Sequence, residues 1–342
     1  MKDIFSLLDN VQKGDSLSIN DIVLIVDGLN LYLRAFAVNG ALNDNGVPVG
    51  GLTGFLRSLA YAIREVNPTR VIIVYDGTGG SQRRRKIHPE YKSQRKPGKR
   101  MTRWDAFKNA TEEKEAMKIQ FSRLLDYLDF LPINVISIDR IEADDAIAYI
   151  ANKLVKEEVT IMSSDQDFLQ LVDDRITVWS PTKKIFYTPE RVFEDYGVPA
   201  HNFLMYKVLM GDKSDNISGV QGLGPKKLPK IIPDIVSQNP LDLDFIVGYA
   251  NKGTEPMHKR IVESENQLQL NEQLMDLKNP PISGEIKLQI SRLIEAPINL
   301  LSRNDFIIMY NDDQLGNIIQ VPDLWLKEHF TKLNTLAKQT HE

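Results

Sequence analysis

Four short apolar runs limit the folds open to this chain. Residues 22–26, 71–75, 133–138 and 159–162 are rich in Val and Ile, and they are separated by longer stretches whose apolar residues recur at helical spacing. Buried runs that alternate with helices indicate a parallel β-sheet covered on both faces. In such a sheet the carboxyl ends of the strands lie along one edge. Residues that follow the four runs should therefore lie close together.

Acidic residues follow every one of these runs. They are Asp27, Asp76, Glu142, Asp144, Asp145, Asp165 and Asp167. Taken alone, residues 142–145 would be explained as an acidic first turn facing the dipole of the helix predicted over 143–154. Seven carboxylates at one edge would repel one another unless cations lay among them. Oxygen ligands without Cys suit Mg²⁺ or Mn²⁺, and a pair of such ions can activate water and stabilise the leaving oxygen of a phosphodiester.

A second acidic motif, at residues 211–216, adds Asp212 and Asp215 and brings the acids to nine. Residues 222–225, Gly-Leu-Gly-Pro, then precede two lysines. This pattern predicts a glycine hairpin that opens a helix, with Pro225 in its first turn. Bare backbone N–H groups in such a hairpin can receive phosphate oxygens without reading sequence. A plain turn between helices is the simpler explanation of the glycines alone.

A strongly basic segment follows Gly79 and Gly80. Between Arg83 and Arg103 there are ten Lys or Arg residues against one acid, a net charge of +9. Because the segment begins near the predicted metal-binding edge, we expect it to grip a phosphate backbone. A solvated surface is the ordinary explanation of such a run. Tyr91 and Trp104 lie among the charges, where they would either stack on bases or pack in the core.

The composition narrows the class of protein. A length of 342 residues suggests two domains, or one large domain with an appendage. The net charge of −4 argues against a uniformly basic DNA-binding protein. The chain has no cysteine, which excludes disulfides and thiolate chemistry, and no apolar run of membrane-spanning length. We expect a cytoplasmic protein with no membrane partner.

Together these motifs resemble the 5′-nuclease (flap endonuclease, PIN-like) family. The matching stretches are residues 25–28, 75–77, 84, 91–95, 141–147, 163–168, 211–216 and 222–225. They occur along the chain in the same order as in the family. The chain is most similar to the bacteriophage ribonuclease H type and to the 5′-3′ exonuclease domain of bacterial DNA polymerase I. The resemblance covers residues 20–235.

The resemblance implies an α/β fold: a parallel-sheet PIN-like core with a basic arch, a helix-three-turn-helix element and a helical C-terminal region. It implies a nuclease core in residues 1–188, with the arch at 79–104. A helical domain would follow in 189–342, with the helix-three-turn-helix element at 204–236.

Residues 236–342 carry no motif that matches the family. Apolar spacing predicts helices over 261–274 and 288–294, in a bundle packed near the glycine hairpin. By the same resemblance this region would dock a single-stranded DNA-binding protein or a sliding clamp, although no clamp-binding peptide is visible at 335–342.

The resemblance also implies roles for individual residues. One metal would lie among Asp27, Asp76, Asp144 and Asp165, with Glu142 and Asp145 close by, and the second would face Asp167, Asp212 and Asp215. Lys92 and Arg95 would hold and polarise the scissile phosphate, and Arg84 would contact a further phosphate. The residues expected to bind the nucleic-acid backbone are Arg83, Arg85, Lys86, Lys96, Gly222, Gly224, Lys226 and Lys227. Where many relatives have an aromatic residue to stack on the terminal base this chain has Leu33, so Tyr32 or Phe36 would have to substitute.

The implied activity is Mg²⁺-dependent hydrolysis near 5′ ends, as a 5′-3′ exonuclease, flap endonuclease and ribonuclease H. Substrates would be DNA duplexes with a 5′ end or flap and RNA–DNA hybrids, including RNA primers in replication. Mn²⁺ would substitute for Mg²⁺, K⁺ would bind at the glycine hairpin, and the enzyme would be a monomer. Two alternatives remain: a PIN-type single-strand RNase, which needs neither arch nor hairpin, and a non-catalytic DNA-binding module, which does not need all nine acids.

Overall fold

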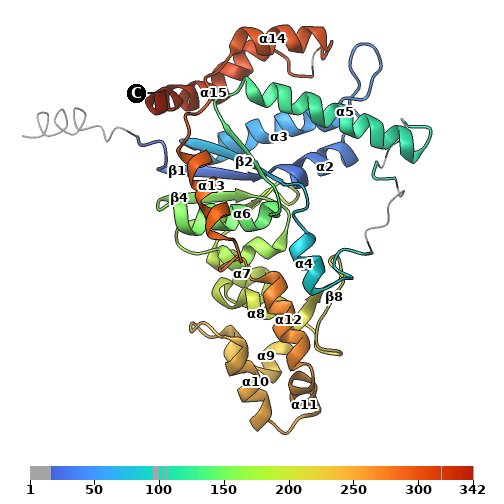
Figure 1. Cartoon of the computed structure of the whole chain (residues 1–342), viewed down its shortest axis with the longest axis vertical. Helices are drawn as coiled ribbons and strands as arrows, with labels where there is room; N and C mark the ends of the chain where they lie inside the picture. Colours follow the sequence, from blue (N-terminus) through green and yellow to red (C-terminus); the bar gives the residue numbers. More distant parts are fainter. Residues whose placement is uncertain (1–16, 95–99, 103, 105–106, 317, 342) are drawn as a thin grey trace, which may run out of the picture.

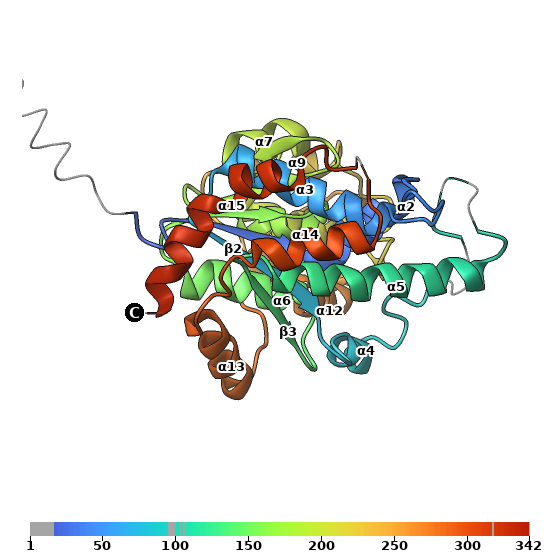
Figure 2. The same cartoon turned by 90° about the horizontal axis from the view of Figure 1, so that it is seen from above.

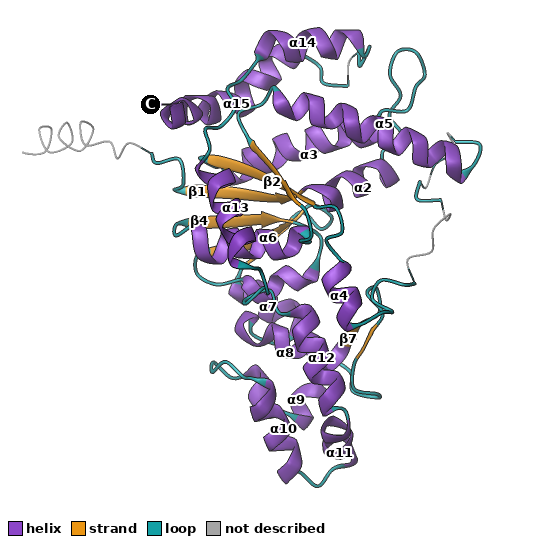
Figure 3. Ribbon diagram, in the orientation of Figure 1, coloured by secondary structure: helices purple, strands orange, loops and turns teal. Residues whose placement is uncertain are grey.

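The computed structural model describes residues 17–94, 100–102, 104, 107–316 and 318–341. A six-stranded sheet lies in its upper half, in the order β3-β2-β1-β4-β5-β6 (Figure 3). The strands are β1 (Ile22–Asp27), β2 (Arg70–Asp76), β3 (Asn134–Ile138), β4 (Glu158–Met162), β5 (Ile176–Ser180) and β6 (Ile185–Tyr187). Neighbouring strands are parallel except for β6, which runs antiparallel to β5. The four predicted strands and the α/β fold class are confirmed.

The order of the strands reverses at β1. From β1 the chain moves through β2 to β3 on one side and then crosses to β4 and β5 on the other. Val26 is paired with Met162 and Asp27 with Val74, so the residues after β1, β2 and β4 emerge at one edge. Such a switch point opens a crevice beyond the carboxyl ends of the strands.

Apolar side chains alternate between the two faces of the sheet, as the two-residue period of a strand requires. Val23 and Ile25 belong to the core on one face, and Leu24 and Val26 to the core on the other. The first face is covered by α6 (Ala143–Tyr149), η1 (Ile150–Leu154), η2 (Gln166–Leu171) and α13 (Gly284–Glu295). The second is covered by α2 (Gly28–Val38), α3 (Gly50–Val66), α5 (Ala110–Asp129), α14 (Arg303–Asp312) and α15 (Pro322–Lys338). Figures 1 and 2 show these layers from two directions.

A third core lies below the sheet in Figure 1 and is mainly helical. Its elements are α8 (Phe203–Met210), α9 (Leu228–Ile231), η4 (Pro233–Val236), α10 (Leu243–Lys252), α11 (Pro256–Glu263) and α12 (Glu265–Met275), with a ribbon of β7 (Gly211–Asp212) and β8 (Ile217–Ser218). The remaining short elements are α4 (Gln82–Ile87), α7 (Pro189–Tyr196), η3 (Ala200–Asn202) and η5 (Gln339–His341). The buried Asn271 ties this region together, since its Nδ2 donates to the carbonyls of Val208 and Ser218 at 2.9 and 2.8 Å.

Several helices begin and end where the sequence signals them. Thr188 caps α7 by accepting a hydrogen bond from the backbone N–H of Arg191, with Pro189 in the first turn. The same helix ends at Gly197, whose φ of 68° favours glycine. α3 ends at Asn67, also in the left-handed region, directly before Pro68. The helix predicted over 143–154 is present, but its last turn is the π-helical η1.

The C-terminal region departs from the prediction of one bundle beside the glycine hairpin. The helix predicted over 261–274 is broken at Ser264 into α11 and α12. The helix predicted over 288–294 is present as α13, but it packs against β3. α15 packs against β2 and α3, and α14 packs against α15. Amphipathic spacing shows which face of a helix is buried, but it does not show which element that face packs against. The domain boundary at residue 188 stays a prediction.

Candidate active site

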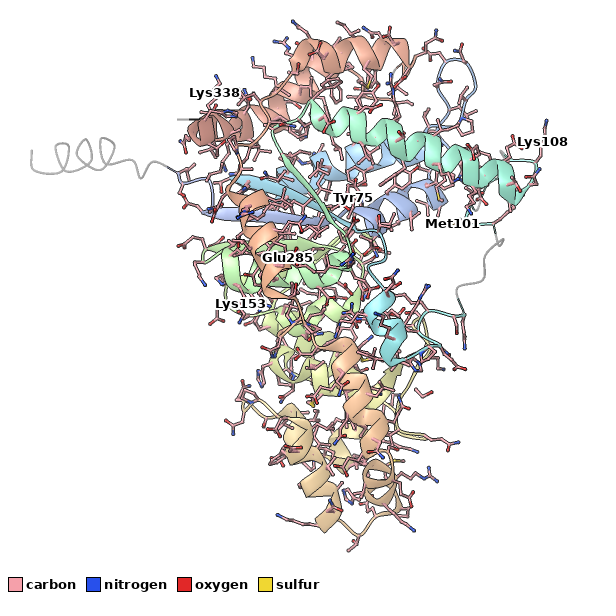
Figure 4. All side chains as sticks on the ribbon, in the orientation of Figure 1. Tyr75, Met101, Lys108, Lys153, Glu285 and Lys338 are labelled. Atoms are coloured by element: carbon pink, nitrogen blue, oxygen red, sulfur yellow. The ribbon has the colours of Figure 1, made fainter. Side chains whose placement is uncertain are left out.

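A narrow acidic cleft lies at the carboxyl edge of the sheet, at the switch point. Its volume is about 150 Å³, and its lining includes five of the predicted acids: Asp27, Asp76, Glu142, Asp144 and Asp165. They come from the ends of β1 and β2, from the start of α6 and from the turn after β4. Tyr75, next to Asp76 in the sequence, is near the middle of the molecule (Figure 4). The predicted convergence of these acids on one edge is therefore observed.

Asp27 is held in place from two sides. Its carboxylate accepts a hydrogen bond from the backbone N–H of Asn30, which caps α2, and another from Ser163 Oγ at 2.9 Å. Gly28 allows the ring of Tyr75 to approach, because a Cβ at that position would lie 2.4 Å from the ring. Asp76 Oδ1 accepts from the backbone N–H of Ala143 at 2.8 Å and so links β2 to the start of α6.

Burial and mutual repulsion make two of these acids hold protons more tightly. Desolvation raises the pKa of Asp27 to about 7, against the hydrogen bonds from Ser163 and Asn30, and the charges of Asp76 and Asp144 add to the increase. Asp165 is open to the cleft on one side, yet the protein around it desolvates the carboxylate and raises its pKa to about 6. Such a site favours binding of a cation.

Arg84 neutralises two of the acids from inside the protein. Its guanidinium donates to Asp145 at 2.9 and 2.7 Å and also to Glu142, and its Nε donates to the backbone carbonyl of Leu274 at 2.9 Å. Asp144 lies 3.7 Å from the same group. Only 3% of Arg84 is exposed, so it has no face to offer a phosphate. The predicted phosphate contact through Arg84 is wrong, because the guanidinium is used to hold Glu142 and Asp145 in place.

Lys92 reaches the cleft from the basic segment. It lines the cleft and its Nζ donates to Glu142 at 2.6 Å. Burial alone would lower the pKa of Lys92, but Glu142 and Asp144 outweigh this effect and raise it. An ammonium has three donor hydrogens, so Lys92 can bond both Glu142 and a substrate oxygen.

The acids predicted for a second metal form a separate group beside the cleft. Lys207 in α8 lies between Asp167 and Asp212, with its Nζ 2.9 Å from one carboxylate and 2.6 Å from the other. Desolvation and the charge of Asp165 raise the pKa of Asp167 to about 7 despite this lysine. Burial would also raise the pKa of Asp212, but hydrogen bonds from Lys207 and Ser214 lower it. The nine acids therefore do not share one pocket, and protein cations neutralise part of the charge that was assigned to metals.

The beginning of the basic segment is docked on the 211–216 loop. The backbone N–H of Lys92 donates to the carbonyl of Asp215 at 3.0 Å, and the ring of His88 lies 3.0 Å from the carbonyl of Asn216. Gln94 Nε2 donates to the side chain of Asn216 at 2.8 Å. These contacts fix Lys92 between the cleft and Asp215, a residue more than a hundred positions from Lys92 in the chain.

The other predicted backbone-binding residues have varied surroundings. Arg85 and Lys86 are exposed on α4, whereas the half-buried Arg83 lines a cavity with Glu272 and Asp276. Two of the predicted residues, Arg95 and Lys96, lie outside the described residues.

The glycine hairpin is present in a modified form. Gly222 has a φ of 82°, and a turn from Gly224 precedes α9, which begins at Leu228 and not at Pro225. The exposed Lys227 donates to the carbonyl of Gly222 at 3.2 Å, and Lys226 is exposed beside it.

The aromatic side chains predicted to stack on bases are used for packing. Tyr32 and Phe36 are 1% and 0% exposed, so neither can replace an aromatic residue at Leu33, which itself lines the cleft. Tyr91 is buried in the helical core, and Trp104 packs against Phe107 with ring centroids 5.4 Å apart. Each of these rings is used in packing within the protein.

The donors present fit a divalent cation. Oxygen atoms of Glu142, Asp144 and Asp145 lie within 4.8 Å of one another, and carboxylates are the ligands that hard divalent ions prefer. Because Arg84 already binds Glu142 and Asp145, the carboxylates left for an ion in the cleft are Asp27, Asp76, Asp144 and Asp165.

Within the described residues, no helix is both long and apolar enough to cross a lipid bilayer.

Sequence reasoning missed two supporting residues. Lys207 is the single charged residue of α8, whose sequence is FLMYKVLM, and a lone cation in an apolar helix is a signal that could have been used. Ser163 was noted only as part of a motif, and its hydrogen bond to Asp27 depends on the pairing of β1 with β4.

Comparisons with known proteins agree with this geometry. Residues 22–197 match the family described as 5′-3′ exonuclease, N-terminal resolvase-like domain. A 5′-3′ exonuclease of Bacillus subtilis is 34% identical over 225 residues, 62% of this chain and 70% of that protein. A 5′-3′ exonuclease of Aquifex aeolicus is 32% identical over 211 residues, 61% of this chain and 68% of that protein. The structure of T5 5′-exonuclease with divalent metal ions (zinc) bound shares the fold, with a TM-score of 0.61 and 21% identity over 85% of this chain and 98% of that one.

Proposed function

Because this chain belongs to the 5′-3′ exonuclease family, we propose that it is a metal-dependent 5′ nuclease that hydrolyses phosphodiesters near the 5′ ends of nucleic-acid duplexes. The observation that carries the proposal is the acidic cleft at the strand switch point, where Asp27, Asp76, Asp144 and Asp165 meet one lysine, Lys92. A carboxylate cleft by itself would repel a phosphodiester. A cleft that also binds cations and presents an ammonium would attract one.

In this proposal each residue has a defined task. Asp27, Asp76, Asp144 and Asp165 would hold a divalent ion, with Asp167, Asp212 and Asp215 beside a second. When bound, such ions supply an activated water and stabilise charge on the phosphate. Lys92 would orient the scissile phosphate and lower the energy of the charge that develops on it. Arg84 would position Glu142 and Asp145 without touching the substrate.

The same proposal includes the identity of the ion, the substrates and the residues that bind the backbone. We propose Mg²⁺ as the physiological ion, with Mn²⁺ as a substitute, because the ligands are oxygen atoms only. Substrates would be duplexes with a 5′ end or flap and RNA–DNA hybrids, including RNA primers, and the protein would act as a monomer. The exposed Arg85, Lys86, Lys226 and Lys227 would bind the backbone, as would the N–H groups near Gly222 and Gly224. K⁺ at the glycine hairpin would have to compete with Lys227 for the carbonyl of Gly222.

The experiment that tests the proposal is product mapping on 5′-labelled substrates with and without Mg²⁺. A duplex with a 5′ flap and an RNA-primed duplex should both be cut near the 5′ end, and only when Mg²⁺ is present. Single-stranded RNA of the same sequence serves as the comparison. Preferential cutting of that RNA would favour a PIN-type RNase, and no Mg²⁺-dependent cleavage of any substrate would favour a non-catalytic binding module.

A further inference from the structure

Asn216 is a half-buried residue at the end of the second acidic motif, directly before β8. Its backbone carbonyl lies 3.0 Å from the ring of His88, which follows α4, and Figure 1 shows α4 beside β8. The proposed function gives Asn216 no task. Its contacts nevertheless lie on both sides of Lys92, the lysine of the acidic cleft.

The side chain of Asn216 forms hydrogen bonds with the basic segment before and after Lys92. Its Nδ2 donates to the carbonyl and to Oε2 of Glu90, both at 3.2 Å, and lies 3.5 Å from Ser93 Oγ. Its Oδ1 accepts a hydrogen bond from Gln94 Nε2 at 2.8 Å. One side chain therefore holds the chain on either side of the lysine.

Lys92 and Asn216 share an uncommon backbone conformation. Their φ angles are 57° and 62°, in the left-handed region that residues other than glycine rarely adopt. An asparagine tolerates this region, whereas a lysine there is strained because its Cβ is close to the following carbonyl oxygen. Strained residues keep such a conformation where the surrounding contacts hold it. For Lys92 these contacts are the bond from its N–H to the carbonyl of Asp215, at 3.0 Å, and the neighbours held by Asn216.

The ammonium of Lys92 reaches the acidic cleft from this backbone. Its Nζ donates to Glu142 at 2.6 Å, and 18% of the side chain is exposed. The preceding Tyr91 is buried in the helical core, and its ring centroid lies 4.7 Å from the same Nζ. Tyr91 fixes the chain before Lys92, and Asn216 fixes it after Lys92 as well. A catalytic group that is misplaced by about 1 Å can lower a rate about 100-fold.

From these observations we propose that Asn216 is a positioning residue, which holds the segment around Lys92 so that the ammonium reaches the acidic cleft. Asn216 does not line the cleft, and it needs no contact with substrate or metal for this task. Because Lys92 is the group that it places, this role rests on the proposed function. The loop that carries Asp212 and Asp215 would then also set the position of the lysine that acts on the phosphate.

The test uses Asn216→Gly, because glycine adopts the left-handed conformation freely and removes every side-chain contact. Single-turnover cleavage of a 5′-flap duplex in Mg²⁺ should slow about tenfold or more, because Lys92 is misplaced. The dissociation constant of the labelled duplex, from fluorescence anisotropy without Mg²⁺, should stay within about twofold of the wild type.

The same change in a Lys92→Ala background tests whether Asn216 acts through Lys92. It should slow cleavage by less than about twofold beyond Lys92→Ala alone, because no ammonium is left to position. An equal loss in both backgrounds would overturn the proposal, since Asn216 would then act through Asp215 or through the fold.

Amide hydrogen exchange of the metal-free protein tests the same role without cleavage. Residues 88–94 should exchange about fivefold faster or more in Asn216→Gly, because hydrogen bonds that hold them are lost. Unchanged exchange in these residues would overturn the proposal. If the wild type shows no Mg²⁺-dependent cleavage, the proposed function fails, whereas the exchange result still decides whether Asn216 holds this segment.

Asn67→Gly is the matched control. Asn67 also has a left-handed backbone, with a φ of 49°, and it is exposed between α3 and the start of β2, at the opposite edge of the sheet from the cleft. Its variant should keep the wild-type rate and the wild-type exchange of residues 88–94. Losses equal to those of Asn216→Gly would overturn the proposal.

Asn216→Asp separates the hydrogen bonds from the flexibility that glycine adds. Aspartate keeps the shape of the side chain and tolerates the left-handed conformation. Its carboxylate can accept from Gln94 but cannot donate to Glu90, so this variant should also slow cleavage and speed exchange of residues 88–94. Wild-type rates and exchange in Asn216→Asp would show that the donated hydrogen bonds do not position Lys92, and would overturn the proposal.

Discussion

Arg84 and Asp145 form a bidentate ion pair inside the protein, with the two Nη···Oδ distances at 2.9 and 2.7 Å and both side chains buried. Arg84→Met would leave Asp145 and Glu142 buried without their shared cation, and the loss of one partner of a buried pair costs about 3–5 kcal/mol. We expect the free energy of unfolding to fall by that amount in urea denaturation.

Arg85→Met is the control, because Arg85 is exposed on the same short helix. Its free energy of unfolding should stay within about 0.5 kcal/mol of the wild type. If Arg84→Met were as stable as the wild type but bound duplex more weakly, Arg84 would be a phosphate contact after all.

Asp27→Asn and Asp165→Asn should each abolish cleavage in Mg²⁺ while duplex binding survives. Both carboxylates line the acidic cleft, and an amide is a poor ligand for a hard cation. Cleavage of a 5′-flap substrate and fluorescence anisotropy of the labelled duplex measure the two properties. Asp139→Asn, an exposed acid just after β3 that does not line the cleft, should keep full activity. Normal cleavage by Asp27→Asn and Asp165→Asn would remove the cleft from the chemistry.

Lys92→Ala should reduce turnover more than affinity. Lys92 Nζ is in the cleft, and removing one donor that stabilises a developing charge typically lowers the rate about 100-fold or more. Single-turnover cleavage gives the rate and anisotropy gives the dissociation constant. Lys118→Ala, which removes an exposed lysine of α5 that has no proposed role, should change the rate little. A loss explained wholly by weaker binding would make Lys92 a binding residue only.

The raised pKa of Asp27 predicts how stability depends on pH in the absence of metal. The folded protein keeps a proton on Asp27 up to about pH 7, whereas the ordinary pKa of the group is 3.8. The folded state therefore binds more protons in this range, and this group makes the protein less stable as pH rises from about 4 to 7. Asp27→Asn should be more stable than the wild type at pH 8 in EDTA, by at least ~1 kcal/mol. The gain should disappear near pH 4. Urea denaturation at pH 4 and at pH 8 measures both values, and a gain that persists at pH 4 would contradict the prediction.

The sheet and its acidic edge could be predicted because both follow from local patterns. Buried β-branched runs specify parallel strands, and the register of β1 with β2 and β4 then brings Asp27, Asp76 and Asp165 together. The role of Arg84 could not be predicted in this way. Arg83, Arg84 and Arg85 are alike in sequence, and only the packing of α4 near Leu274 and α6 decides which of them is buried.

The distribution of charge was also hidden from the sequence. From the nine acids we predicted that metal ions would supply the positive charge. Arg84 and Lys207 supply part of that charge instead. The partners of α13, α14 and α15 could not be predicted either, because an apolar helix face fits any apolar surface of suitable shape.

Lys207 provides a test of how protein cations and metals share the acids. Its ammonium lies between Asp167 and Asp212, where a divalent ion would also be attracted, and only 7% of the residue is exposed. Without this lysine the two carboxylates would face each other unpaired. A divalent cation bound between them would then replace the missing charge and would stabilise the folded state by mass action.

Lys207→Met should therefore lower the thermal midpoint in EDTA, and added Mg²⁺ should raise that midpoint more than it does in the wild type. Thermal unfolding followed by circular dichroism, with and without Mg²⁺, measures both effects. Lys213→Met is the control, because Lys213 is exposed one residue beyond Asp212 and its loss also removes one positive charge near that carboxylate. Its response to Mg²⁺ should match that of the wild type. An equal response in Lys207→Met would mean that no ion takes the place of the ammonium, and that Asp167 and Asp212 serve the fold instead of a second metal.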